Sequence, residues 1–135
     1  MAFRPLHWDE GQTLLVPATN TTTFTKGNAL TYTSGLLDNA AAGTAKDVYF
    51  VAAKTVTTTV SGQLIEVWPT VGVVYEADVD TTWATADVGT LADLATVSTV
   101  NPDASTHDLF LILSGIGATA VGTKVVGRFM HANES

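Results

Sequence analysis

The 135-residue chain contains no cysteine, which excludes disulfide bonds and thiolate metal sites. Only 14% of its residues are charged, and it holds four prolines. The longest apolar run, residues 109–113, has the length of a strand and is far shorter than the roughly 20 residues that a membrane-spanning helix needs. The first ten residues lack the apolar core of a secretory signal. The absence of cysteine fits assembly in a reducing cytoplasm, which we expect for this chain.

Basic residues are also scarce. Six Lys and Arg stand against 13 Asp and Glu, giving a formal net charge of −7. A chain with this balance is repelled by phosphate backbones and by anionic membrane surfaces. We therefore expect neither a nucleic-acid partner nor a membrane partner.

The abundant residues are threonine and valine, with runs such as Thr21–Thr23 and Thr57–Thr59 between short apolar stretches and glycines. Branching at Cβ restricts χ1 and favours strands over helices. Turn signals separate the candidate strands at the roughly ten-residue spacing that is typical of sandwiches and barrels. The sequence predicts an all-β fold: a single-domain β-sandwich or barrel of about eight short strands over residues 12–135. We expect at most one short helical turn. It would lie either in residues 36–46, which otherwise form a loop, or in residues 91–95.

Residues 109–113 are apolar on both faces of an extended chain, so we expect this segment to be the most buried strand. Alternation in the other candidate strands selects the remaining core positions. The predicted core consists of Val48, Phe50, Leu64, Val73, Tyr75, Leu109, Leu111, Leu113 and Phe129.

Residues 1–11 form a separate segment, an extended N-terminal arm. Pro5 disfavours regular pairing, and Phe3, Leu6 and Trp8 are apolar groups on a stretch too short to hold a core. These three side chains either pack onto their own domain or bind a partner. We expect the second, with the arm docked on a neighbouring subunit.

No constellation of residues predicts catalysis. Glu76, Asp78, Asp80, Asp87 and Asp93 form an acidic stretch whose spacing does not match an EF-hand loop, so we expect a solvated surface, with a Ca²⁺ site as the alternative. The three histidines have no metal-binding spacing, and no nucleotide-binding loop is present. The sequence therefore predicts no enzyme, no cofactor and no metal.

Three tryptophans could stack on sugar rings. Trp68 lies in a good strand and is expected in the core, whereas Trp83 lies in a polar turn and is the candidate exposed contact. Trp83 beside acidic residues would be the site of a carbohydrate-binding β-sandwich, which is one alternative function.

The C-terminal half carries three short motifs: Gly72–Asp78, Ala86–Leu94 with its D-V-G turn and D-L pair, and Val125–Phe129, which reads V-V-G-R-F. In these motifs the chain resembles the small decoration, or cement, proteins of tailed-phage heads. The resemblance implies a structural virion protein, oligomeric on the capsid, that binds the outer surface of the major capsid protein and stabilises the head. A tail or head-fibre module is the other virion alternative.

Overall fold

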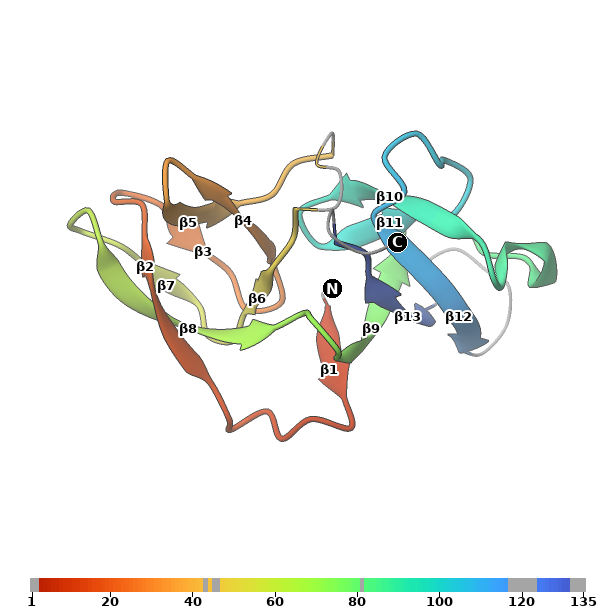
Figure 1. Ribbon diagram of the computed structural model, residues 1–135, viewed down its shortest axis with the longest axis horizontal. Coiled ribbons are helices and arrows are strands. Elements are labelled where there is room, and N and C mark those ends of the chain that lie inside the picture. Colours follow the sequence, from red (N-terminus) through yellow and green to blue (C-terminus); the bar gives the residue numbers. More distant parts are fainter. Residues whose placement is uncertain (1–2, 43, 45–46, 81, 117–123, 132–135) are drawn as a thin grey trace.

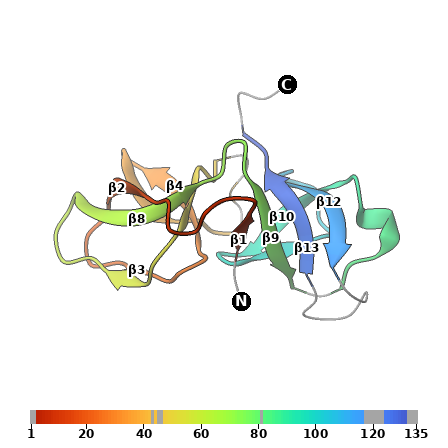
Figure 2. The same cartoon turned by 90° about the horizontal axis from the view of Figure 1, so that it is seen from below.

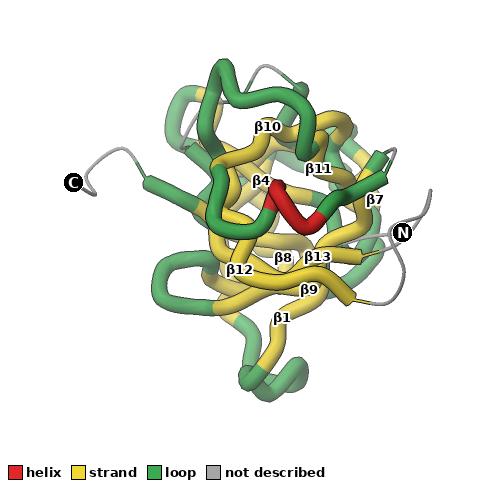
Figure 3. The backbone as a smooth tube through the Cα atoms, turned by 90° about the vertical axis from the view of Figure 1, so that its right-hand side faces the viewer, coloured by secondary structure: helices red, strands yellow, loops and turns green. Residues whose placement is uncertain are grey.

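The computed structural model describes residues 3–42, 44, 47–80, 82–116 and 124–131. Within these residues the all-β prediction is confirmed: there are thirteen strands, and the helical structure is one 3-10 turn at Thr85–Asp87 (Figure 3). The predicted number of strands was too low. Segments expected to be loops pair as short strands, and residues 36–39 are an example.

The first part of the fold is a closed five-stranded barrel, at the left of Figure 1. Two further short strands, β3 (Thr23–Phe24) and β7 (Val56–Thr57), pair with each other as a separate ribbon. In order round the barrel, the strands are β2 (Leu14–Ala18), β5 (Leu36–Asn39), β4 (Ala29–Thr33), β6 (Phe50–Ala52) and β8 (Gln63–Pro69).

The second part is a six-stranded sheet in which β13 pairs with β9 as well as with β12. This extra pairing closes five of the strands into a ring, and we call the whole sheet the rolled sheet. Its order is β1 (Arg4–Leu6), β9 (Val74–Val79), β11 (Thr99–Asn101), β10 (Leu91–Thr96), β12 (Phe110–Ile116) and β13 (Lys124–Phe129).

Two clusters of buried side chains form the core. The smaller one fills the barrel and includes Leu30, Leu37 and Ile65. The larger one fills the rolled sheet and continues onto the outer face of the barrel, where it includes Val51 and Trp68. The barrel and the rolled sheet, which lie side by side in Figures 1 and 2, are therefore joined by a shared apolar core.

The N-terminal segment is not a free arm. Residues 4–6 form β1, which pairs with β9 so that Pro5 lies opposite Tyr75. Phe3 is 1% exposed, and its ring centroid lies 4.8 Å from that of Phe129. The prediction that Phe3 binds a neighbouring subunit is therefore wrong, because this side chain completes the core of its own chain. Pro5 is accommodated because β1 is at the end of the strand order.

Strand β12 is buried on one face only. Phe110 and Ile112 are fully buried, whereas Leu113 is 45% exposed and Leu111 is intermediate. The prediction that Leu113 belongs to the core is wrong, and the same holds for Leu64, which is 54% exposed in β8. Both errors have the same cause, because these strands cover the core with one face and present leucine on the other. The remaining predicted core residues are buried or partly buried.

Gly127 in β13 lies where this strand packs closely against β12. A Cβ at this position would lie 2.1 Å from the backbone oxygen of Leu111 and 2.5 Å from the Phe110 ring. A backbone atom cannot swing aside as a flexible side chain does, so we expect Gly127→Ala to lower the free energy of unfolding by about 1–3 kcal/mol. Urea denaturation followed by tryptophan fluorescence measures this change.

The matched control is Gly11→Ala. A Cβ at Gly11 would meet only the carboxylate of Asp9, at 3.3 Å, on an exposed loop. We expect a change below about 0.5 kcal/mol for this variant. Equal effects of the two substitutions would contradict the packing of β13 against β12.

Candidate interaction surfaces

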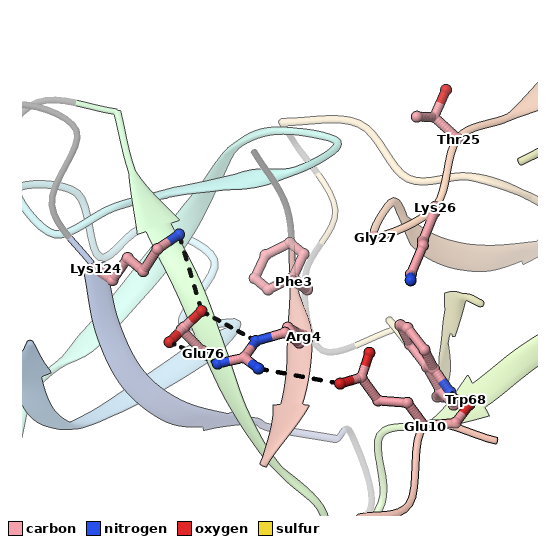
Figure 4. A pocket seen from close by; sticks show the side chains of 9 residues that line it. All are labelled: Phe3, Arg4, Glu10, Thr25, Lys26, Gly27, Trp68, Glu76 and Lys124. Carbon is pink, nitrogen blue, oxygen red and sulfur yellow. Dashed lines mark hydrogen bonds and ion pairs between the residues drawn. The ribbon is translucent and has the colours of Figure 1, made fainter. Parts of the chain in front are cut away.

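A cleft of about 530 Å³ lies where the barrel, β1 and the rolled sheet meet (Figure 4). Its aromatic walls are Phe3 and Trp68, both almost completely buried. The indole Nε1 of Trp68 donates a hydrogen bond to the backbone oxygen of Glu10 at 2.9 Å, which ties the loop after β1 to the barrel. The Lys26 ammonium lies 5.9 Å from the centre of the Trp68 ring.

The other charges of the cleft pair with one another. The guanidinium of Arg4 donates to both carboxylate oxygens of Glu76, at 3.3 and 3.2 Å, and lies 4.0 Å from Glu10 (Figure 4). Lys124 lies 3.9 Å from Glu76 and also donates to Asp78. Burial alone would raise the pKa of Asp78, but the hydrogen bonds that it accepts, including the one from Lys124, give a net downward shift. Since these charges satisfy each other and join β1, β9 and β13, the cleft has the features of a structural joint.

The acidic residues noted in the sequence are divided among several places: Glu76 and Asp78 both pair with Lys124, whereas Asp87 and Asp93 bind backbone amides elsewhere. The Asp93 carboxylate accepts three backbone hydrogen bonds, from Thr106, His107 and Asp108 at 2.8–3.0 Å, and so fixes that loop. Asp87 accepts a backbone hydrogen bond from Ala84 at 2.7 Å. Among the described residues, no group of three His, Asp or Glu side chains is arranged to hold a metal ion.

Trp83 is less exposed than its polar turn suggests, and its role as a contact stays a prediction. The side chain is partly buried and packs against the larger core cluster. A Cβ at Gly115 would lie 2.2 Å from the indole ring, so the ring lies directly over this glycine of β12. Its buried Nε1 has no hydrogen-bond partner in the described structure. The turn that carries Trp83 is polar in sequence. The indole can pack against β12 because residue 115 is glycine and has no Cβ in its way.

Leu6 and Trp8 are partly buried. Trp8 packs at the edge of the core cluster, and its Nε1 donates to the backbone oxygen of Gln12 at 3.0 Å. Both side chains therefore belong to the fold, and their binding of a partner stays a prediction.

The barrel exposes a group of apolar side chains that the sequence reasoning did not select. Leu15, Leu64 and Val60 are 61%, 54% and 59% exposed, and they are three of the four described large hydrophobic residues that are more than half exposed. The fourth, Val71, lies in the turn between β8 and β9. Alternation along β8 is the signal that locates Leu64: Ile65 and Val67 lie in the barrel core, which leaves Leu64 on the opposite face.

Charge is divided unevenly between the two parts of the chain. Residues 14–69, which contain the barrel, hold three basic and three acidic residues, so their net charge is zero. The rest of the chain holds three basic and ten acidic residues and carries the whole net charge of −7. The protein is therefore polarised, with a neutral barrel and an acidic rolled sheet.

Comparison with known proteins found no matching family model, no similar curated protein and no similar solved structure. In the part of the chain that the structure describes, no helix has the length and apolar character to cross a membrane.

Proposed function

We propose that the protein is a structural component of a tailed-phage virion, a decoration protein that binds the outer surface of the major capsid protein and stabilises the head. The role is not enzymatic. The observation that carries the proposal is the division of the molecule into a neutral barrel with exposed leucines and an acidic rolled sheet. Such a molecule can dock one end on a surface while the other end stays solvated and repels its neighbours.

The motifs of the C-terminal half support the same function, since they resemble those of head decoration proteins. Two of them have structural roles in this chain. Gly127 of the V-V-G-R-F motif permits close packing against β12, and Asp93 of the D-L pair fixes the loop 106–108. Repeated copies on one shell would add avidity, because each engagement raises the effective concentration for the next. Outer binding also suits the charge, since an acidic protein inside the head would meet DNA phosphates.

The test is saturation of purified, tail-free heads that lack the protein. We expect co-sedimentation at micromolar protein concentration, many copies per head, and longer survival of the decorated heads on heating. Salt should weaken this binding much less than it weakens a DNA-binding protein. Binding confined to isolated tails or fibres would replace the head function with the tail or fibre alternative. For the carbohydrate-binding alternative, Trp83 is partly buried and one face of its ring lies against β12, which leaves at most the other face for a sugar.

A further inference from the structure

The cleft between Phe3 and Trp68 has the size and the lining of a small-molecule site. Its volume of about 530 Å³ falls within the roughly 300–1,000 Å³ that is usual for ligand pockets. The two aromatic rings form its floor, and the long side chains of Arg4, Lys26 and Lys124 line it as well (Figure 4). The stems of such side chains are aliphatic, so a ligand would meet mainly carbon, with a few charged groups to fix its orientation.

The cleft gathers basic residues in a chain that has few of them. Arg4, Lys26 and Lys124 are three of the six Lys and Arg in the sequence. Two carboxylates, those of Glu10 and Glu76, line the cleft with them. Three basic against two acidic residues give the lining a net charge of +1, whereas the whole chain carries −7. The cleft therefore favours an anion on a protein that otherwise repels anions.

Two other surface hollows have the opposite charge. Among the described residues, neither hollow is lined by lysine or arginine. Five carboxylates line them, those of Asp80, Asp87, Asp93, Asp103 and Asp108. An anionic ligand would therefore be directed to the cleft and away from these hollows.

Lys26 is the cation of the cleft that no carboxylate holds. Arg4 and Lys124 both pair with Glu76, and each has a second acidic partner. In the part of the chain that the structure describes, no carboxylate lies within 4.0 Å of the Lys26 ammonium. Figure 4 shows the dashed ion pairs on the side of Arg4, with Lys26 apart from them and beside Trp68. The Lys26 ammonium is therefore available to an anion that enters the cleft.

The position of Lys26 links this charge to the aromatic floor. Its ammonium lies over the Trp68 ring, 5.9 Å from the ring centre. Lys26 is an exposed residue in the turn before β4, so its side chain can swing away, whereas the Trp68 indole is fixed by its hydrogen bond to Glu10. Trp68 is 1% exposed with Lys26 over it. When the ammonium turns toward an anion, part of the ring becomes open to an apolar group.

We propose that the cleft binds a small aromatic carboxylate, with the carboxylate held by Lys26 and the aromatic body placed against Trp68. The single cation without a carboxylate partner matches a single negative charge. A phosphate dianion would need a second cation, but Arg4 and Lys124 are already paired with Glu76. The apolar floor accounts for the aromatic body of the ligand. This inference does not rest on the proposed function.

Titration of isotope-labelled protein with hydrocinnamate, followed by NMR, tests the site. The reporter is the indole N–H of Trp68, which donates to Glu10 beside the cleft, so its resonance should shift as the ligand binds. We expect saturable shifts with a dissociation constant of about 1 mM or below. Hydrocinnamyl alcohol has the same ring and chain without the charge, and it should bind at least about fivefold more weakly.

Two substitutions assign the binding to Lys26. Lys26→Gln removes the cation from an exposed turn, and Lys54→Gln is the matched control, because the Lys54 side chain is 66% exposed, pairs with Glu66 and does not line the cleft. Thermal unfolding first verifies that both variants are folded. We expect Lys26→Gln to weaken hydrocinnamate binding at least about fivefold and Lys54→Gln to change it by less than about twofold.

Three results would overturn the proposal. The first is the absence of a saturable shift of the Trp68 resonance in the unmodified protein. The second is equal binding of the acid and the alcohol, which would remove the role of the charge. The third is unchanged binding by Lys26→Gln, or equal weakening by both substitutions, which would show that Lys26 does not hold the carboxylate.

Discussion

Replacing Phe3 with alanine is expected to lower the free energy of unfolding by about 3–5 kcal/mol, the range for a large aromatic removed from a core. The side chain is 1% exposed and its ring lies against those of Phe129 and Phe110, with centroids 4.8 and 6.0 Å away. Its backbone amide also donates to Gly27 of the barrel at 3.1 Å. Loss of the ring leaves a cavity where the barrel and the rolled sheet share their core.

Chemical denaturation of the purified protein measures this effect. Leu15→Ala is the control, because that side chain is 61% exposed, and we expect it to change stability by less than about 0.5 kcal/mol. An unchanged stability of the Phe3→Ala variant would restore the interpretation of the N-terminus as a free arm.

The second large effect is expected in β12, where neighbouring residues face opposite sides. Ile112→Ala should lower the free energy of unfolding by about 2–5 kcal/mol, since Ile112 is fully buried in the rolled sheet. Leu113→Ala removes a similar side chain that is 45% exposed, so its effect should be below about 1 kcal/mol. Melting temperatures of the two variants, measured together, give the comparison. A larger effect at residue 113 would mean that the strand has the opposite face inside.

The fold class followed from local chemistry, since β-branched residues and regular turns favour an all-β chain whatever the arrangement of its strands. The exact strands did not follow. Asp38 and Asn39 are polar residues that favour turns, yet residues 36–39 pair with β4 in the barrel. Pairing with distant strands decided their structure, and a single sequence contains no direct signal of it.

The interaction surface was harder to predict than the fold. Phe3 and Leu64 are both apolar residues near strand ends, but Phe3 is buried and Leu64 is exposed. The difference depends on where the rolled sheet covers the barrel, which is set by contacts such as Ala29 to Val97 across the two parts. The partial burial of Trp83 could not be predicted from local sequence either. It depends on Gly115, which is 32 residues away in sequence and adjacent in space.

The uneven distribution of charge would affect how neighbouring copies interact on a shell. Copies that dock through their neutral barrels would present acidic rolled sheets to solvent, where like charges keep neighbouring copies apart. The paired charges among Arg4, Glu76 and Lys124 hold β1, β9 and β13 together within the rolled sheet. The Phe3 amide, which donates to the Gly27 oxygen at 3.1 Å, links this sheet to the barrel side. A load applied to the barrel would therefore be transmitted to the rolled sheet through the shared core and this joint.

The measurement that tests the central claim most directly is an electron cryomicroscopy reconstruction of heads saturated with the purified protein. We expect regularly spaced density on the outer surface of the shell, with the barrel against the capsid protein and the rolled sheet pointing outward. Bare shells at saturating protein concentration, or density in which the rolled sheet contacts the shell and the barrel faces solvent, would contradict the account.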